Sequence, residues 1–453
     1  MKKYSVWFLI GFIQALLAGT QDSTAVSYSI PATPRRPLIA VGEMMAANAV
    51  VWGFNRYIRE DNYSFFISWR TVEANLRHGM EWDPNKFSVN FFAHPFHGSI
   101  YFNAARSNGF NFWESAPFSL AGSLMWEFFM ESEYASYNDL VMTTFGGIAL
   151  GETFHRLSEQ ILDDRARGFN RVWREFTALV INPMGGFNRL VSGQMFRTTS
   201  SVNHLRLPIT GYFAFGSAGR TEGISNQASR LNPAFELTLH YGHAFEKERH
   251  RKPFDYFTFR MWTSRGEVER NLTILARANL VGKNLHTGAN QRHLIGISQQ
   301  FDYIDLEIFK IGAMSFGPEW LGHFPLGSDF SLVGGVYAGG IIMGAGSNEY
   351  VESYQGRNYN FGWGFKTKAD FQIRHPRFGF LYFDHNFFYI DSREGAPGHD
   401  RLHLTSVSYN FPVWHNLAVG AEYFNYYRNA HYDEYPDVKQ SVNGFRGLFT
   451  VMF

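Results

Sequence analysis

The sequence predicts a transmembrane antiparallel β-barrel of about twelve strands, preceded by an apolar-rich α-helical domain. Three observations support this prediction: a final segment with one apolar and one polar face, a change from helical to strand periodicity along the chain, and a high aromatic content. The 453 residues include 46 Phe and 23 Tyr, and aromatic residues make up 18% of the chain. Aromatic side chains are favoured on pleated surfaces and in girdles at the two bilayer interfaces.

The chain begins with the pattern of a secretory signal peptide. Lys2 and Lys3 precede an apolar stretch over 4–17, and small residues follow at 18–20. This stretch is shorter than the roughly 20 residues that a membrane-spanning helix needs, which disfavours the alternative of a retained anchor. We therefore expect residues 1–20 to be a signal peptide.

Composition excludes several classes of function. Cysteine is absent, so disulfides, thiolate metal sites, cysteine nucleophiles and lipoprotein attachment are all excluded. Lys plus Arg number 41 and Asp plus Glu 40, and this net charge of +1 gives no reason to expect a nucleic-acid partner. The longest charge-free helical runs after the signal segment, 115–126 and 140–151, are shorter than a transmembrane helix. We therefore expect lipid contact through alternating strands.

The region 36–194 has helical periodicity and forms the predicted helical domain. Its Phe, Trp and Met residues fall on more than one face of the predicted helices. We therefore expect these helices to pack against each other and against the barrel mouth or the inner leaflet of the outer membrane. Gly146 and Gly147 lie inside a helical pattern and would permit close helix packing. The predicted helices are 37–57, 65–76, 110–131, 139–163 and 170–180.

The pattern becomes strand-like after Pro208, so we place a boundary near 198–207 and a barrel over 208–453. Apolar and polar residues alternate along 233–245 and 358–374. A Lys or Arg at the bilayer midplane costs roughly 2 to 4 kcal/mol, so the polar face must line a lumen. A soluble sandwich would also alternate, but its strands would be nearer the usual 5 to 6 residues. The twelve expected strands are 208–218, 233–245, 254–265, 270–282, 291–303, 306–317, 329–341, 358–374, 378–391, 402–411, 416–428 and 441–453.

The last thirteen residues have the form of a closing strand. Phe445, Phe449 and the terminal Phe453 share one face, and Arg446 and Thr450 share the other. An aromatic carboxyl terminus on such a strand resembles the assembly signal of bacterial outer-membrane barrels. We therefore expect Phe453 to engage the barrel-assembly machinery and the outer face to contact outer-membrane lipid.

The strand pattern assigns a set of charged residues to the lumen, with cations in excess. Such an excess favours anionic solutes, whereas internal salt bridges would close a lumen of mixed charge, and both alternatives stay open. The expected lumen residues are Glu236, His240, Arg260, Arg277, Lys366, Lys368, Asp370, Arg374, Glu422 and Arg446.

The helical region holds the candidate catalytic residues Glu127, Glu152 and His155. Glu127 and Glu131 are one helical turn apart, so we expect both on one face of the predicted helix. Glu152 and His155 form a Glu-x-x-His pair, a spacing that in some helical bundles presents both groups to one metal. A carboxylate in apolar surroundings could act in acid–base chemistry through a shifted pKa.

Candidate metal ligands are His94 and His97, which form a His-x-x-His pair, together with Glu131. No cofactor is predicted, and a divalent metal is the minor alternative. In the structural alternative, Glu127 pairs with an arginine such as Arg106 or Arg156, because a buried carboxylate is costly unless it is paired.

A long run in the helical region reads His94-Pro-Phe-His97-Gly98-Ser99-Ile100-Tyr101-Phe102-Asn103-Ala104-Ala105-Arg106-Ser107-Asn108-Gly109. It is followed by Phe112-Trp113-Glu114-Ser115, Trp126-Glu127 and Gly151-Glu152. Together these motifs resemble an uncharacterised family of Gram-negative envelope proteins, in which a helical domain of unknown function is followed by Asn182-Pro183 and a carboxyl-terminal barrel. The resemblance implies this architecture and an envelope location, and it carries no activity. It implies that the family pattern includes His94, His97, Glu114, Glu127, Glu152 and Arg189.

We expect an outer-membrane channel or amphiphile-handling protein whose helical domain lies on the periplasmic side and acts as a gate. A barrel of about twelve strands is too narrow to hold five helices, so most of the domain should lie below it. One alternative is an envelope enzyme that modifies lipid or lipopolysaccharide with the Glu and His residues. Another is a structural barrel scaffold. A non-enzymatic role is favoured, and the sequence indicates no oligomeric state.

Overall fold

The computed structural model divides the chain into two compact units, one ending at Pro208 and the other running from Ile209 to Phe453. The predicted signal peptide, 1–20, lies outside the described residues. The structure describes residues 34–59, 63–200, 204, 206–221, 232–245, 250–265, 270–288, 290–306, 308–350 and 356–453.

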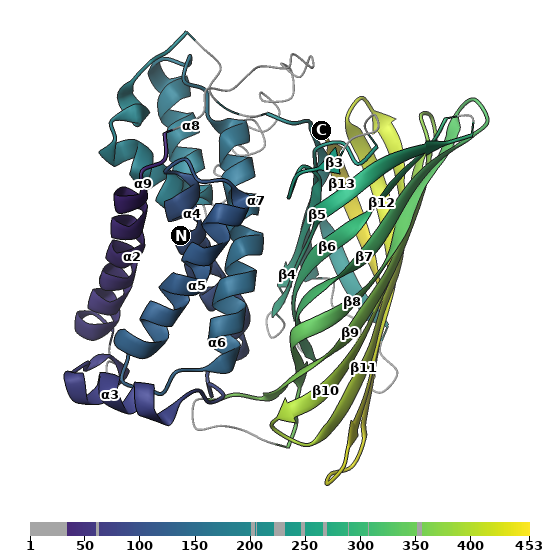
Figure 1. Cartoon of the computed structure of the whole chain (residues 1–453). Coiled ribbons are helices and arrows are strands. Elements are labelled where there is room, and N and C mark those ends of the chain that lie inside the picture. Colours follow the sequence, from purple (N-terminus) through teal and green to yellow (C-terminus); the bar gives the residue numbers. More distant parts are fainter. Residues whose placement is uncertain are drawn as a thin grey trace. The chain divides into compact units, whose positions relative to one another are not determined.

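The first unit is helical (Figure 1). Two π-helical segments, η2 (Val89–Ala93) and η3 (Met142–Gly146), lead directly into α4 and α7. Two short 3₁₀ turns, η1 (Tyr63–Phe65) and η4 (Gln194–Phe196), complete the described elements of this unit. The α-helices are α2 (Pro37–Tyr57), α3 (Trp69–His78), α4 (His94–Arg106), α5 (Phe112–Phe129), α6 (Tyr137–Val141), α7 (Gly147–Ile161), α8 (Gly168–Ile181) and α9 (Pro183–Val191).

Capping side chains explain where two helices begin later than the sequence pattern predicts. The Ser68 side chain accepts a hydrogen bond from the Thr71 N–H, so α3 starts at Trp69. Asn111 accepts from the Glu114 N–H and the Glu114 carboxylate accepts from the Asn111 N–H, which fixes the start of α5. Because α5 ends at Phe129, the prediction that Glu131 shares a helix face with Glu127 is wrong.

Helix α4, like α9, is absent from the predicted set of helices. It packs against α2, α5, α7 and α9 and is therefore the centre of the unit. Pro95 lies in its first turn, where the missing N–H costs no intrahelical hydrogen bond. The helix predicted over 139–163 is interrupted by η3, which faces α4.

Glycines bring α4 and α7 into backbone contact. A Cβ atom on Gly98 would lie 1.8 Å from the carbonyl oxygen of Thr143, and one on Gly147 would lie 2.5 Å from the carbonyl carbon of Gly98. No side chain larger than hydrogen fits between these two helices at this point. The two glycines therefore set how closely the helices approach.

Helix α2 corrects one sequence-based expectation. It is the one described helix that is long and apolar enough to cross a bilayer by length and composition. A search for charge-free runs misses it because Glu43 interrupts the run. Glu43 is buried and accepts hydrogen bonds from Asn108 and Asn188, while Leu38 and Val50 on the same helix are 87% and 70% exposed.

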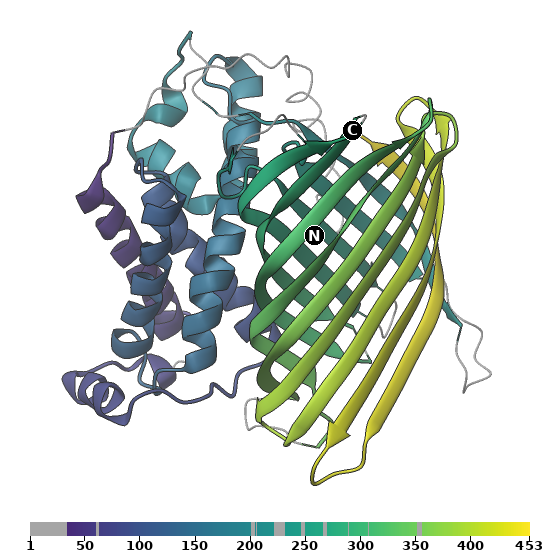
Figure 2. The ribbon, with the colours of Figure 1, turned by 45° about the vertical axis from the view of Figure 1, so that its right-hand side comes forward.

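The second unit is a closed antiparallel barrel of twelve long strands (Figure 2). Each strand pairs with its neighbours along the chain, and β13 pairs with β1 to close the ring. The two-residue β3 (His250–Arg251) adds to the edge of β5. The twelve strands are β1 (Ile209–Thr221), β2 (Asn232–Tyr241), β4 (Phe257–Arg265), β5 (Arg270–Thr287), β6 (Gln291–Asp305), β7 (Lys310–Leu326), β8 (Phe330–Ser347), β9 (Tyr359–His375), β10 (Gly379–Glu394), β11 (Gly398–Trp414), β12 (Leu417–Tyr432) and β13 (Val438–Met452).

Because side chains alternate with period two along each strand, apolar side chains cover the outside of the barrel and buried side chains point inward. Along β10, Asp384, Asn386 and Phe388 are buried, whereas Leu381 and Phe383 are 44% and 37% exposed. Successive side chains of a strand point to opposite faces, so the exposed set forms the outer surface. The prediction of a closed twelve-stranded barrel is confirmed.

Replacing Gly98 by alanine should destabilise the helical unit by roughly 1 to 3 kcal/mol, because the added methyl group must push α4 away from η3 and α7. The measurement is denaturant unfolding of the full chain, followed by the helical circular-dichroism signal at 222 nm. Gly42→Ala is the matched control, since a Cβ atom there meets nothing within 4 Å. Equal stability of the Gly98→Ala variant and the wild type would contradict the close contact.

Candidate functional site

The barrel lumen contains a cavity of about 1170 Å³ at the end that carries short turns. Thr210 lies at the start of β1, Ser331 follows the β7–β8 turn, and Arg374 and Phe380 flank the β9–β10 turn. Seven of the ten predicted lumen residues line this cavity, namely His240, Arg260, Arg277, Lys366, Lys368, Asp370 and Arg374. The other three, Glu236, Glu422 and Arg446, are buried in ion pairs inside the same lumen.

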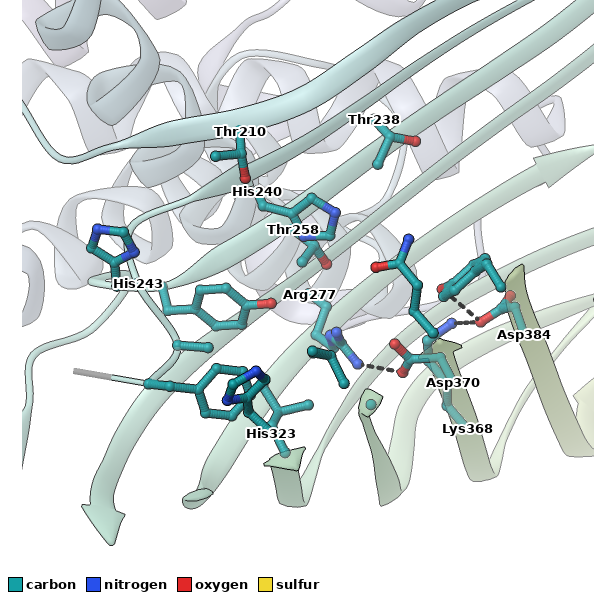
Figure 3. Close-up of a pocket in the computed structure, with 18 of the residues that line it drawn as sticks. Thr210, Thr238, His240, His243, Thr258, Arg277, His323, Lys368, Asp370 and Asp384 are labelled. Carbon is teal, nitrogen blue, oxygen red and sulfur yellow. Dashed lines mark hydrogen bonds and ion pairs between the residues drawn. The ribbon is translucent and has the colours of Figure 1, made fainter. Parts of the chain in front are cut away.

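Ion pairs cross the lumen between strands that are not neighbours. Arg277 on β5 donates to Asp370 on β9 at 2.8 Å, and Lys366 on β9 donates to Asp302 on β6 at 2.7 Å. Figure 3 shows the Arg277–Asp370 pair beside the pair of Lys368 with Asp384. Of the two alternatives that the sequence left open, the described residues favour a cross-linked lumen.

A second set of ion pairs joins β2, β4, β12 and β13. Arg260 on β4 donates to Glu236 at 2.7 Å and approaches Glu422 on β12 at 3.4 Å. Arg446 donates to the other oxygen of Glu422 at 2.8 Å and stacks over the Trp262 ring at 3.8 Å. A buried charge is tolerated when it is paired and hydrogen-bonded, so this network keeps a polar interior stable.

The cavity still has an excess of positive charge. Its lining includes six Lys or Arg side chains and three Asp side chains. Four of the six cations form ion pairs. Within the described part of the chain, Arg292 and Arg374 pair with no carboxylate, and Arg374 donates to the Gln372 side chain. The uncompensated charge therefore lies near the short-turn end.

An apolar layer crosses the lumen beyond the Lys366–Asp302 pair. Phe388 on β10 and Leu402 on β11 are cross-strand neighbours in this layer and are fully buried. Trp262 contributes from β4, on the far side of the ring. The sequence reasoning missed this layer, although its members alternate with outward residues as the charged ones do. The layer comprises Trp262, Ile304, Leu306, Phe309, Ile311, Ala313, Ile341, Phe388, Ile390, Leu402 and Leu404.

In the helical unit, Glu152 forms a buried ion-pair triad and is not available as a metal ligand. Arg106 donates to it at 2.7 and 3.1 Å, and Arg156 donates at 2.7 Å. Burial alone would raise the pKa of Glu152, but the two guanidinium groups lower that pKa to about 2. Burial lowers the pKa of His155 to about 4. The predicted Glu152–His155 metal pair is therefore wrong, because two arginines already satisfy the carboxylate.

A second Arg-paired group surrounds Arg189. Arg189 donates to Glu175 at 2.7 and 2.9 Å and to Asp164 at 2.7 Å. His204 lies 2.9 Å from Glu159 and 3.2 Å from Asp164. Burial opposes a charged imidazole, but Glu159 and Asp164 raise the pKa of His204 to about 9. Of this group, the sequence indicated only Arg189.

His94 and His97 do not face a common point. The His97 Nε2 atom lies 2.9 Å from the Tyr101 hydroxyl, which also bonds Asn48, and burial lowers the pKa of His97 to about 3. His94 instead lies 3.4 Å from Asp139. The prediction that His94 and His97 form a metal-binding pair is therefore wrong, because the two rings have different partners.

The structure assembles a buried acidic cluster that the sequence reasoning identified only in part. It consists of Asp83, His94, Glu127 and Asp139, of which Asp83 and Asp139 were not predicted. The Glu127 carboxylate accepts from the Ser136 N–H at 2.9 Å, so the predicted pairing of Glu127 with an arginine is wrong. Burial raises the pKa of Asp83 and of Asp139 to about 7, and raises that of Glu127.

Two further predicted residues take local roles. Glu114 caps α5 and pairs with Arg35. Glu131 lies just after α5, where burial and the neighbouring Glu127 raise its pKa well above the usual range.

Replacing Glu152 by glutamine should destabilise the helical unit by roughly 3 to 5 kcal/mol, because it removes the buried carboxylate that both Arg106 and Arg156 contact. We expect the denaturation midpoint to fall when unfolding is followed by the helical circular-dichroism signal. Glu73→Gln is the control: its pair with Arg77 is exposed and should contribute less than about 1 kcal/mol. Similar midpoints for the two variants would contradict a buried triad.

Comparison with known proteins gives a family match for part of the helical unit. Residues 79–184 match the family model described as a domain of unknown function (DUF3943). This range runs from the end of α3 to the start of α9 and includes the acidic cluster. Among curated proteins, none matches the chain.

The barrel is similar to solved outer-membrane proteins. The outer membrane channel DcaP of Acinetobacter baumannii shares 8% identity, with 54% of this chain and 96% of that chain covered and a TM-score of 0.23. The KdgM porin shares 10% identity, with 53% and 99% covered and a TM-score of 0.24. The toluene transporter TodX of Pseudomonas putida shares 7% identity, with 54% and 89% covered and a TM-score of 0.23. The likeness concerns the fold alone.

The family match confirms the resemblance that the motifs of the helical region predict. The chain thus carries a DUF3943 domain over residues 79–184, followed by a closed twelve-stranded barrel.

Proposed function

We propose that the protein is an outer-membrane conduit for small anionic or amphiphilic solutes, and that the apolar layer is its constriction. The cavity of about 1170 Å³ carries this proposal, because its cations outnumber its carboxylates by six to three. Apolar side chains such as Phe245, Leu321 and Phe380 line the same cavity. A solute with an anionic group and an apolar part would find complementary surfaces there.

The turn lengths of the barrel support one orientation of the barrel in the outer membrane. Short turns of bacterial barrels face the periplasm, so the cavity would open on that side. The strand that starts at Ile209 enters from the same end, and the helical unit precedes it in the chain. We therefore propose a periplasmic helical unit that regulates access. The backbone of Phe453 bonds to Gly211 at this end, and we propose that the barrel-assembly machinery binds this final strand.

The geometry gives the enzyme alternative less support. Glu152 is held by two arginines, and its pKa lies far from the range useful for acid–base catalysis at neutral pH. Burial keeps His155 and His97 neutral, with pKa values of about 4 and 3. A scaffold role would not require a large cavity with excess positive charge. Conduction therefore explains more of the described features.

Shortening two residues of the apolar layer should open the conduit. In the double variant Phe388→Ala/Leu402→Ala, two fully buried inward side chains on adjacent strands are truncated, so water can enter the constriction. We expect single-channel conductance in planar bilayers to rise several-fold over that of the wild type.

The matched control is Phe383→Ala/Val407→Ala. These residues also pair between β10 and β11, but they are 37% and 38% exposed on the outer face. This control should leave conductance unchanged. Unaltered conductance in a correctly folded Phe388→Ala/Leu402→Ala protein would sink the proposal that the apolar layer is the constriction.

The two arginines that pair with no described carboxylate should make the opened conduit anion-selective. In the Phe388→Ala/Leu402→Ala background, adding Arg292→Gln and Arg374→Gln lowers the number of cations in the cavity lining from six to four. The reversal potential in a KCl gradient should then move toward that of K⁺, and more strongly at low salt, where screening is weaker. Arg393→Gln, which removes an exposed charge paired with Asp391, is the control. A reversal potential insensitive to the two lumen substitutions would contradict the proposed anion preference.

A further inference from the structure

We propose that the acidic cluster of the helical unit binds one divalent transition-metal ion, of the Zn²⁺ class, through Asp83, His94 and Asp139. One ligand atom from each residue can be chosen so that all three lie within 4.8 Å of one another. The site is independent of conduction through the barrel.

The ligand geometry fits a small ion. The distance from His94 Nε2 to Asp139 Oδ1 is 3.4 Å, which is long for a hydrogen bond. A tetrahedral ion with bonds of about 2.1 Å holds its ligand atoms roughly 3.4 Å apart. A set with an imidazole and carboxylates suits Zn²⁺ or a similar transition metal better than Mg²⁺ or Ca²⁺, which prefer oxygen ligands alone.

Surrounding side chains hold these ligands in place. Thr143 Oγ1 lies 3.3 Å from His94 Nδ1, where it can accept a hydrogen bond from the Nδ1–H group and leave Nε2 free for a metal. Asn85 donates to Asp83 at 2.8 Å, and Asn138 donates to Asp139 at 2.8 Å. Ligands of metal sites commonly have such outer partners, which fix their orientation.

Backbone contacts bring the ligands together before any ion binds. Glu81 and Ser136 form a parallel bridge, and the Asp83 N–H donates to the Asn138 side chain at 2.9 Å. His94 is the first residue of α4, which packs against η3. The site therefore joins the segment at Asp83, the start of α4 and the short helix α6.

Unpartnered buried oxygen atoms in the cluster offer ligands to a cation. Asp83 Oδ2 and Glu127 Oε1 are buried and have no hydrogen-bond partner among the described residues, and these two side chains are 6% and 1% exposed. The Ser136 hydroxyl lies 2.5 Å from Asp139 and 3.2 Å from Glu127, yet its one proton cannot satisfy both carboxylates.

Two other buried acidic residues of the unit differ from the cluster, because they have arginine partners. Glu152 and Glu175 are each neutralised by two arginines. Within the described residues, no Lys or Arg forms an ion pair with Asp83, Glu127 or Asp139. A buried carboxylate group without a counter-charge is costly, and a bound metal ion removes that cost. Glu127 is the third carboxylate of the cluster, and we propose that it borders the ion as a further ligand or as a base.

The test uses the full chain in detergent, stripped with EDTA and then dialysed against Zn²⁺, Mn²⁺ or Mg²⁺. We expect about one Zn²⁺ per chain by elemental analysis and a melting temperature of the helical signal that rises by several degrees with Zn²⁺. Asp139→Asn and His94→Ala should each lose both effects. Asp139→Asn removes a negative charge from a crowded site, so it should fold without metal, and Asp83→Asn provides a second variant of the same kind.

Glu43→Gln is the matched control. Glu43 is also a buried carboxylate of this unit, but its partner Asn108 lies just beyond the far end of α4, roughly 20 Å along the helix from His94. This variant should keep the bound Zn²⁺ and the thermal shift. Absence of bound metal and of any shift in the folded wild type would overturn the proposal. So would zinc binding that Asp139→Asn and His94→Ala retain, since the ion would then be held elsewhere, for example by surface histidines.

Discussion

The requirement that every buried charge find a counter-charge governs both units of this protein. In the barrel, period-two alternation sends each inward charged residue into an enclosed space, where water cannot solvate it as bulk solvent would. The charges therefore pair across the ring, as Arg277 does with Asp370 and Lys366 with Asp302. In the helical unit, Arg106 and Arg156 do the same for Glu152. In the acidic cluster, three carboxylates lie together and no described Lys or Arg meets this requirement, so we propose a cationic ligand there.

The strands could be predicted from the sequence because their signal is local and strict. A shift of one residue would turn every inward residue toward lipid, so the alternation in segments such as 358–374 fixes both the strand and its orientation. The helices were harder to place. Helix α4 begins with a histidine and a proline, and π-helical turns at Val89–Ala93 and Met142–Gly146 disturb the 3.6-residue period that marks its neighbours.

The site could be predicted only in part, because pairing depends on packing between segments far apart in the chain. Arg106 and Glu152 are separated by 46 positions, and nothing in their sequence neighbourhoods distinguishes Glu152 from Glu127 as the partner. The contact of Gly98 with Gly147 determines which carboxylate reaches Arg106. Asp83 lies outside regular structure, so no helical or strand pattern draws attention to it. The histidines of the motif could be identified from the sequence, but the directions in which their rings point depend on how the helices pack.

A twelve-stranded barrel lies between small barrels, which side chains fill, and large porins, which hold an open channel, so its interior residues decide whether it conducts. Here the sheet is held by backbone hydrogen bonds, whereas the apolar layer, which we propose as the constriction, is held by contacts among side chains such as Phe388 and Leu402. Parting that layer would expose apolar surface but break no hydrogen bond between strands. Arg260 and Arg277 each contact two carboxylates, so in the proposed conduit one carboxylate could be exchanged for a solute anion. The proposed opening would then need only side-chain rearrangement inside an intact barrel.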